Sequence, residues 1–213
     1  MTSRILSTPK LRRQAYADAL NNKQTYYVVC SGPAGTGKTM HACQIGANKL
    51  KNGEYQKIII TRPAVSVDEE HGFLPGTLEE KLDPWVKPIT EFLQDTLNIK
   101  DTKTLISEGI IEISPLAYMR GRTFRDCWII ADEMQNCTPN QMKMLMTRLG
   151  DNSKMVITGD TDQSDLYKRE NGLQYLMNAV VKYNGKIKSL ESIEFTKNDV
   201  RRHPAVREIL KVL

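Results

Sequence analysis

One glycine-rich stretch constrains this chain more than any other. Residues 31–40, SGPAGTGKTM, contain the pattern G-x-x-x-x-G-K-T. An apolar run at 26–30 precedes the pattern, and a segment with helical spacing follows it and ends at Gly53. Strand, glycine loop and helix together form the context that a phosphate-binding loop requires. A glycine-rich turn with a surface lysine is the ordinary alternative, and it does not explain why every fixed position of the motif is filled.

The residue types of this loop suit a nucleoside triphosphate and Mg²⁺. Its three glycines allow tight turns that aim backbone N–H groups inward, and the helix N-terminus adds a partial positive charge. We expect Lys38 to reach the β- and γ-phosphates and the Thr39 hydroxyl to ligate Mg²⁺. The residues assigned to the nucleotide are Gly32, Pro33, Ala34, Gly35, Thr36, Gly37, Lys38, Thr39 and Met40.

Length and charge bound the class of protein. A chain of 213 residues suits one α/β domain, so residues 1–213 are assigned to a single domain. The 30 Lys and Arg residues against 25 Asp and Glu give a formal charge of +5, which is compatible with nucleic acid. The sequence has neither a signal peptide nor an apolar run of roughly 18 residues. We therefore expect no membrane partner and a cytoplasmic location, or the host cytoplasm for a viral gene.

Apolar runs alternate with helical patterns along the chain. Five runs predict strands buried on both faces, at 26–30, 57–61, 110–114, 127–131 and 154–158. Such an alternation indicates an α/β fold with a mainly parallel sheet sandwiched by helices. A late run at 187–196 could add an edge strand. Prolines punctuate the region 77–98, which predicts a broken helix pair and not one long helix.

An acidic pair, Asp132 and Glu133, directly follows the fourth apolar run. The carboxyl ends of parallel strands line the ligand crevice, so this pair is placed to meet the phosphate loop. We expect Asp132 to hold the Mg²⁺ shell and Glu133 to orient or deprotonate the attacking water. A loop-facing charge pair is the common alternative. The intervening strands favour the branch of P-loop proteins in which one strand separates the two motif strands and a glutamate drives hydrolysis.

A predicted helix follows the acidic pair. Thr138 is a good N-cap, with Pro139 at the first helical position and Gln141 three residues after the cap, while Gly150 is expected to end the helix. Four apolar residues at helical spacing are assigned to the core: Met142, Leu145, Met146 and Leu149.

The last predicted strand of the five leads into a polar turn. The run at 154–158 delivers Gly159, Asp160 and Gln163 to the same edge of the sheet as the acidic pair. We assign Gln163 as a sensor of the γ-phosphate, because a side-chain amide at that edge could report hydrolysis to neighbouring loops.

Several stretches, taken together, resemble one known family. They are GPAGTGKT, RPAV, HGFLPGTLEEKLDPW, PLAYMRGRTF, ADEMQN, TRLG, SKMVITGDTDQSDL and VRRHPAV. In nearly their full order they resemble the PhoH-like ATPases, over roughly residues 10–210. The resemblance implies a RecA-like P-loop fold related to the first motor domain of superfamily-one helicases. It also implies that ATP is bound and hydrolysed, with RNA as the nucleic acid.

The resemblance implies roles for further residues. Arg62 and Arg122 would contact nucleic acid, and Tyr118, Arg120 and Arg122 lie where a phosphate contact in cis, or a finger offered to a neighbour, is expected. Arg201 and Arg202 are the other candidate arginine fingers. Gln14 stands before Tyr16 and is assigned to adenine, in a register shifted from that of the family, which leaves base specificity open.

Three functions from different classes fit these features. The first is an ATPase coupled to single-stranded RNA or DNA, with a homo-oligomeric ring, such as a hexamer, supplying an arginine from a neighbouring subunit. The second is an ATP-dependent conformational switch that acts on a protein partner without stimulation by nucleic acid. The third, a small-molecule kinase, is disfavoured because Glu133 would direct ATP towards water.

Overall fold

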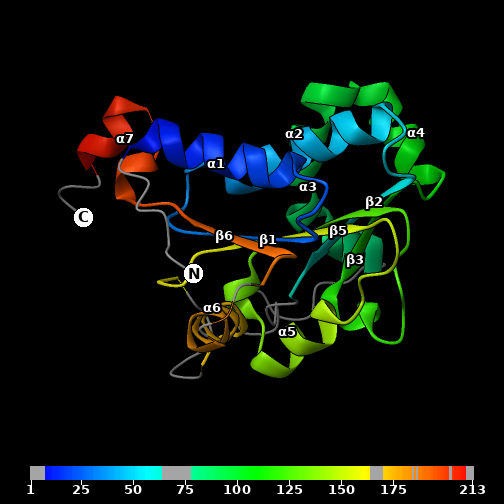
Figure 1. Ribbon diagram of the computed structural model, residues 1–213. Coiled ribbons are helices and arrows are strands. Elements are labelled where there is room, and N and C mark those ends of the chain that lie inside the picture. The colour runs from blue at the N-terminus through cyan, green and yellow to red at the C-terminus, as the bar shows by residue number, and fades with distance from the viewer. Residues whose placement is uncertain are drawn as a thin grey trace.

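The computed structural model describes residues 8–63, 78–163, 170–183, 185, 187–201 and 203–209. A parallel sheet forms its centre (Figure 1). The strands are β1 (Tyr27–Ser31), β2 (Lys57–Arg62), β3 (Ile111–Pro115), β4 (Cys127–Ala131), β5 (Lys154–Gly159) and β6 (Leu190–Glu194). They lie in the order β3-β2-β4-β5-β1-β6, and every neighbouring pair is parallel.

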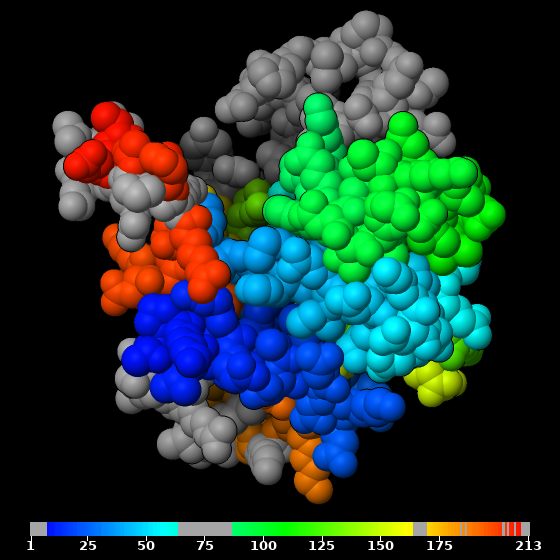
Figure 2. Space-filling model, turned by 90° about the horizontal axis from the view of Figure 1, so that it is seen from above, coloured from blue at the N-terminus to red at the C-terminus, as the bar shows by residue number. Residues whose placement is uncertain are grey.

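Helices cover both faces of the sheet. The described α-helices are α1 (Pro9–Asn21), α2 (Lys38–Lys51), α3 (Leu78–Leu97), α4 (Ile99–Ser107), α5 (Pro139–Met146), α6 (Gly172–Tyr183) and α7 (Pro204–Ile209). One core joins the sheet to α1, α2 and α3, and the other joins it to α5 and α6 (Figure 1). Seen from above, α1 and α2 adjoin the green surface formed by the end of α3 and by α4 (Figure 2). In the described ranges, no helix combines the length and the apolar character needed to cross a membrane.

This arrangement confirms the predicted α/β class. Each of the five expected strands is present within one residue of its predicted ends, and the late run contains a shorter edge strand, β6, beside β1. One strand, β5, separates the strand before the phosphate loop from the strand before the acidic pair, as a RecA-like P-loop fold requires. The prediction that β3 is buried on both faces was wrong. This strand is the other edge strand, and its residues Glu112 and Ile113 are partly exposed.

The prediction of a broken helix pair at 77–98 was also wrong. The region forms one helix, α3, which continues through Pro84 and Pro88. Ile89, Leu93 and Leu97 recur every four residues and are buried in the core shared with α2. Burial of each such side chain contributes about 1.5–3 kcal/mol, which offsets a proline cost of about 3 kcal/mol.

The helix that follows the acidic pair begins as predicted and ends earlier. Thr138 and Gln141 form a reciprocal capping box at the start of α5. The helix ends at Met146, so Gly150 does not terminate it. A Cβ added at Gly150 would lie 2.5 Å from the backbone oxygen of Phe124, which already accepts a hydrogen bond from the Gly150 N–H at 2.7 Å. Gly150 is therefore needed for the close approach of two chain segments.

A tryptophan fixes how closely α2 packs on the sheet. Trp128 of β4 is fully buried, and its indole N–H donates to the backbone oxygen of Ala42 at 3.1 Å. A Cβ added at Gly46 would lie 2.4 Å from the indole nitrogen. The helix that carries the phosphate loop therefore lies against the sheet only because position 46 has no side chain.

We predict that Gly46→Ala destabilises the protein, although alanine is the better helix former by about 1 kcal/mol. The added methyl group overpacks the core, at a cost of about 1–3 kcal/mol in the free energy of unfolding. Urea denaturation measures this change. Asn48→Ala, at an exposed position of the same helix, is the control and should be neutral or slightly stabilising. A Gly46→Ala protein as stable as its parent would show that the contact with Trp128 relaxes without cost.

Candidate nucleotide site

The glycine-rich loop between β1 and α2 has the backbone that its sequence predicts. Gly32, Gly35 and Gly37 have φ values of 131°, 79° and 89°, a region that side chains disfavour. A Cβ at Gly32 would lie 2.3 Å from the backbone oxygen of Phe195, the residue that follows β6. The loop then enters α2, whose N-terminal N–H groups are free of helical partners and suit an anion.

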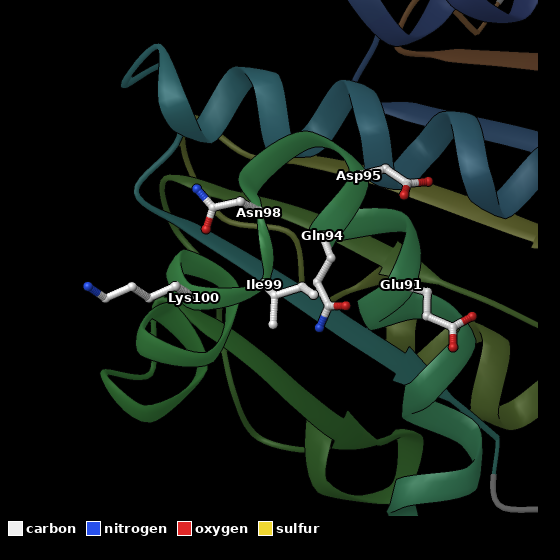
Figure 3. Close-up of a pocket in the computed structure, with 6 residues that line it drawn as sticks. All are labelled: Glu91, Gln94, Asp95, Asn98, Ile99 and Lys100. Carbon is white, nitrogen blue, oxygen red and sulfur yellow. The ribbon is translucent and has the colours of Figure 1, made fainter.

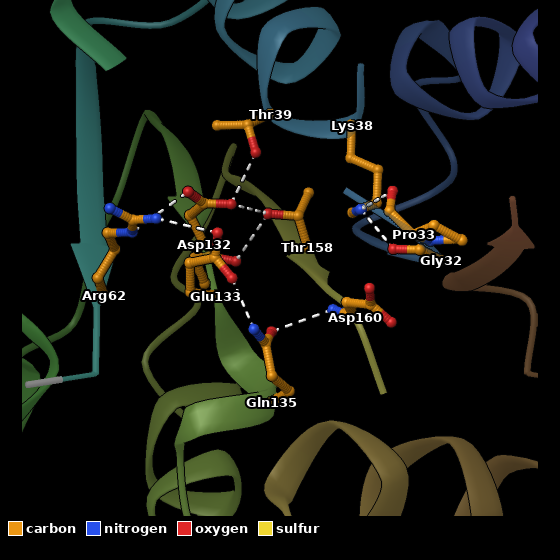
Figure 4. Close-up of polar contacts among 11 residues, drawn as sticks. Gly32, Pro33, Lys38, Thr39, Arg62, Asp132, Glu133, Gln135, Thr158 and Asp160 are labelled. Carbon is orange, nitrogen blue, oxygen red and sulfur yellow. Dashed lines mark hydrogen bonds and ion pairs between the residues drawn. The ribbon is translucent and has the colours of Figure 1, made fainter. Parts of the chain in front are cut away.

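Lys38 lies within the curve of this loop (Figure 4). Its ammonium group donates to the backbone oxygens of Gly32 at 2.5 Å and Pro33 at 3.0 Å, and the residue is 8% exposed. The backbone oxygen of Lys38 accepts a hydrogen bond from the Tyr16 hydroxyl at 3.1 Å. The phosphate loop therefore carries a positive charge held by neutral carbonyl groups.

Asp132 is the centre of a buried polar network. It follows β4, and its Oδ1 accepts hydrogen bonds from the hydroxyls of Thr39 at 2.7 Å and Thr158 at 2.6 Å (Figure 4). Its backbone N–H donates to the Thr61 oxygen at 2.9 Å. The expected meeting of the loop threonine and the first acidic residue is therefore present in the structure.

Arg62, at the end of β2, bridges the acidic pair. Its Nε lies 3.3 Å from Asp132 Oδ2, and its Nη2 lies 3.0 Å from Glu133 Oε1. Glu133 has a positive φ of 55°, which is uncommon for a residue with a side chain, and its side chain is 43% exposed. The contact of Arg62 with nucleic acid stays a prediction, whereas its contact with both carboxylates follows from the geometry.

Gln135 is a site residue that the sequence reasoning missed. Its amide nitrogen donates to Glu133 Oε2 at 2.6 Å, and its amide oxygen accepts from the Asp160 N–H at 3.1 Å. A Cβ at Gly159 would lie 2.5 Å from that amide oxygen. The signal in the sequence was Gly159 at the end of β5, because a residue without a side chain there leaves space for Gln135, which follows β4.

The oxygen atoms gathered here fit Mg²⁺. The Thr39 hydroxyl and the Asp132 carboxylate are hard oxygen donors on adjacent elements. Across the ranges that the structure describes, no group of three or more His, Cys, Asp or Glu side chains forms a metal cage. Mg²⁺ is commonly held by one or two protein oxygens together with substrate phosphates, which is the kind of site that these two residues could provide.

The residue assigned to adenine lies on the outer side of α1. Gln14 is exposed, and its amide donates to Asp18 at 2.9 Å. Tyr16 is fully buried and approaches the ring of His41 edge-on. Burial first, and then the charges of Arg13 and Arg201, lower the pKa of His41. Arg13 of α1 and Arg201 therefore lie close enough to disfavour a charged His41, and adenine contact by Gln14 stays a prediction.

The other predicted arginines fall into different surroundings. Arg120 is exposed after the short 3₁₀ turn Leu116–Met119, and the backbone N–H of Arg201 donates to the Gly35 oxygen at 2.9 Å. Arg122 forms an ion pair with Glu112 on edge strand β3, and its hydrogen bonds lower the pKa of that carboxyl. Arg202 lies outside the described residues.

One predicted residue, Gln163, and one stretch of the sequence remain to be placed. Gln163 is exposed, and its backbone N–H donates to the Asp160 oxygen at 3.2 Å, so its role as a sensor stays a prediction. The stretch GFLPG, residues 72–76, lies outside the described residues.

A separate depression lies near the β3 edge of the sheet (Figure 3). It is lined by residues of α3, α4 and their junction: Glu91, Gln94, Asp95, Asn98, Ile99 and Lys100. The phosphate loop follows β1, which lies four positions from β3 in the sheet order. The side chains of the depression therefore do not belong to the candidate nucleotide site.

Comparison with known proteins relates this site to one family. The family model described as PhoH-like protein matches residues 6–213. A PhoH-like protein of Bacillus subtilis (strain 168) is 52% identical over 182 residues, which cover 84% of this chain and 56% of that protein. A PhoH-like protein of Synechocystis sp. (strain ATCC 27184 / PCC 6803 / Kazusa) is 40% identical over 211 residues, covering 97% and 62%. Protein PhoH of Escherichia coli (strain K12) is 40% identical over 153 residues, covering 71% and 43%. The chain thus spans 43–62% of the length of these relatives.

We predict that Gly32→Ala distorts the phosphate loop. The substitution combines a disfavoured φ with a clash against the Phe195 backbone, so it should lower the free energy of unfolding and weaken the binding of a fluorescent ATP analogue. Gly121→Ala is the control, because Gly121 also has a positive φ but has nothing within 4 Å of the added Cβ. The control should cost only the backbone strain of about 1–2 kcal/mol. Equal costs for the two variants would contradict the proposed clash.

Proposed function

Because the chain belongs to the PhoH-like protein family, we propose that it is an ATPase whose turnover is coupled to single-stranded nucleic acid. The observation that carries the proposal is the meeting of Lys38, Thr39 and the acidic pair at one edge of the sheet. The first two residues suit phosphate and Mg²⁺, and the second acidic residue supplies a carboxylate for water.

The loop binds the triphosphate. Backbone N–H groups of the glycine turns face the phosphates, and the Lys38 ammonium exchanges the carbonyls of Gly32 and Pro33 for phosphate oxygens. Thr39 and Asp132 are the residues that would hold Mg²⁺ together with the nucleotide. When bound, the metal ion neutralises the charge that develops on the β- and γ-phosphate oxygens.

Glu133 acts on the water. Its carboxylate is partly exposed, and the Gln135 amide donates to one of its oxygens, Oε2, at 2.6 Å. The other oxygen, Oε1, accepts the proton of the attacking water as the bond to the γ-phosphorus forms and the bond to the β–γ bridging oxygen breaks. Gln135 is buried and anchored by the Asp160 N–H, so it limits the rotation of the carboxylate.

Three observations support coupling to nucleic acid. The chain carries a formal charge of +5. The short turn after β3 exposes Arg120 together with Tyr118, which is 57% exposed, while Leu116 and Met119 anchor the turn in the core. The strands β2, β3 and β4 run in parallel, so their carboxyl ends lie at the same edge of the sheet. Tyr118 and Arg120 come after the carboxyl end of β3, as Arg62 and the acidic pair come at or after the carboxyl ends of β2 and β4. Exposed aromatic and basic side chains are the usual partners of single strands.

A homo-oligomeric ring, with a hexamer as the expected form, is part of the proposal. Arg120 is exposed and available to a neighbouring subunit, and such an arginine can stabilise the charge of the transition state. Analytical ultracentrifugation with and without ATP tests the ring. A strict monomer under both conditions would exclude it and leave the nucleotide chemistry unaffected.

Steady-state ATP hydrolysis, with and without single-stranded RNA and DNA at two salt concentrations, tests the function. We expect stimulation that weakens as salt rises, because phosphate contacts release counterions. Hydrolysis that ignores both polymers would instead favour a nucleotide-dependent switch acting on a protein partner.

We predict that two substitutions separate binding from hydrolysis. Lys38→Ala should weaken the binding of ATP, because it removes the charge within the loop. Glu133→Gln should preserve binding and lower turnover by about 10²–10⁴-fold, the contribution of a positioned base. Binding is measured with a fluorescent ATP analogue and turnover by phosphate release. An equal loss of binding in both variants would contradict the assigned roles.

We predict that Gln135→Ala lowers kcat by about 10–100-fold with little change in KM, as is typical when the partner of a functional group is removed. The carboxylate of Glu133 would lose the amide that holds it at 2.6 Å. Gln174→Ala is the matched control, because the Gln174 amide donates to Asn178 at 2.9 Å within α6 and not to a carboxylate of the site. A rise in KM at constant kcat would place Gln135 in nucleotide binding instead.

A further inference from the structure

We propose that Arg62 is a positioning residue that competes with Mg²⁺ for Asp132 and restrains Glu133 until a nucleotide is bound. The proposal rests on the proposed function and concerns the regulation of the same site. Its starting point is the double ion pair of Arg62, with Nε 3.3 Å from Asp132 Oδ2 and Nη2 3.0 Å from Glu133 Oε1 (Figure 4).

Each oxygen of the two carboxylates has a partner in this structure. Asp132 Oδ1 accepts from the hydroxyls of Thr39 and Thr158, and Oδ2 faces Arg62. Glu133 Oε2 accepts from Gln135, and Oε1 faces Arg62. Neutral donors hold Asp132 Oδ1 and Glu133 Oε2. The oxygens that face Arg62 are therefore the ones left for function: Asp132 Oδ2 for the Mg²⁺ shell and Glu133 Oε1 for the attacking water.

The positive charge of Arg62 competes with Mg²⁺ for Asp132 and with the attacking water for Glu133. The Asp132 side chain is 5% exposed and that of Arg62 24%, so water screens their attraction only in part. A dication placed beside Asp132 is repelled by the guanidinium, so each cation weakens the binding of the other. Occupation of Glu133 Oε1 by Nη2 also keeps that oxygen from accepting a proton.

Arg62 can leave the carboxylates without a change in the sheet. The backbone of β2 is held to β4 through the register of Thr61 with Ala131 and through the hydrogen bond from the Asp132 N–H to the Thr61 oxygen. Only the side chain of Arg62 has to rotate. Asp132 keeps two hydroxyl donors when it does so, so the buried carboxylate is not left unpaired.

The test is the Mg²⁺ dependence of nucleotide binding, which does not require hydrolysis. The probe is a fluorescent, slowly hydrolysed ATP analogue titrated with Mg²⁺ against the full chain and Arg62→Gln. We expect Arg62→Gln to lower the Mg²⁺ concentration at half-saturation roughly fivefold, the upper end of what a single partly exposed ion pair produces. Arg62→Lys keeps the charge and should stay near the parent value. Arg125→Gln is the control, because Arg125 pairs with Asp151 at a highly exposed position outside the site.

A second readout follows turnover without nucleic acid. Release of Glu133 should raise the basal rate of Arg62→Gln roughly threefold or more at saturating Mg²⁺. An unchanged or higher Mg²⁺ requirement in a folded Arg62→Gln protein would overturn the proposal, because Arg62 would then be neutral or would help Asp132 to hold the metal. A parent chain that binds the analogue with Mg²⁺ but hydrolyses no ATP would overturn the proposed function, while the Mg²⁺ titration would still decide the role of Arg62.

Discussion

A buried carboxylate, that of Asp132, is the constraint on which the site depends. A carboxylate transferred from water into a protein interior is costly unless hydrogen bonds and opposite charges compensate it. Here the compensation comes from Thr39 on α2, Thr158 on β5 and Arg62 on β2. The two hydroxyl donors remain when Arg62 moves away, so α2 and β5 must both be in place for the carboxylate to stay hydrogen-bonded. The same contacts bring the phosphate loop and the acidic pair to one edge of the sheet.

Much of the fold could be predicted because its causes are local. The backbone of the glycine loop could be predicted from its sequence, because positive φ values at positions 32, 35 and 37 favour glycine. The capping box of α5 involves only the four consecutive residues from Thr138 to Gln141, so its pattern can be recognised in the sequence. Continuous apolar runs predicted the strands, and the order of the motifs predicted that one strand separates β1 from β4. Lys38, Thr39 and Asp132 lie where those local signals placed them.

The contacts that could not be predicted join residues far apart in the chain. Arg62 and Glu133 are 71 positions apart, and no spacing rule relates an arginine at one strand end to a glutamate at another. In the sequence, Gln135 looks like an ordinary polar residue of a turn. Its role depends on the hydrogen bond from the Asp160 N–H after β5, which only the folded sheet provides. The proline rule failed in α3 because it counts the lost backbone hydrogen bond and not the tertiary burial that outweighs it. The hydrogen bond of Gln14 with Asp18 could not be foreseen either, because packing decides which face of α1 is exposed; adenine contact by Gln14 stays a prediction.

The segment after β6 supports the phosphate loop from behind. The Phe195 N–H donates to the Ser31 oxygen, the Arg201 N–H donates to the Gly35 oxygen, and Asp199 pairs with Arg12 of α1. A loop at residues 32–38 is thus completed by residues near position 200. During synthesis on the ribosome, the loop lacks this support until residues 195–201 have emerged from the exit tunnel. The nascent chain therefore lacks a finished phosphate loop until β6 and the segment after it have been made, which links ATP binding to the arrival of this edge strand.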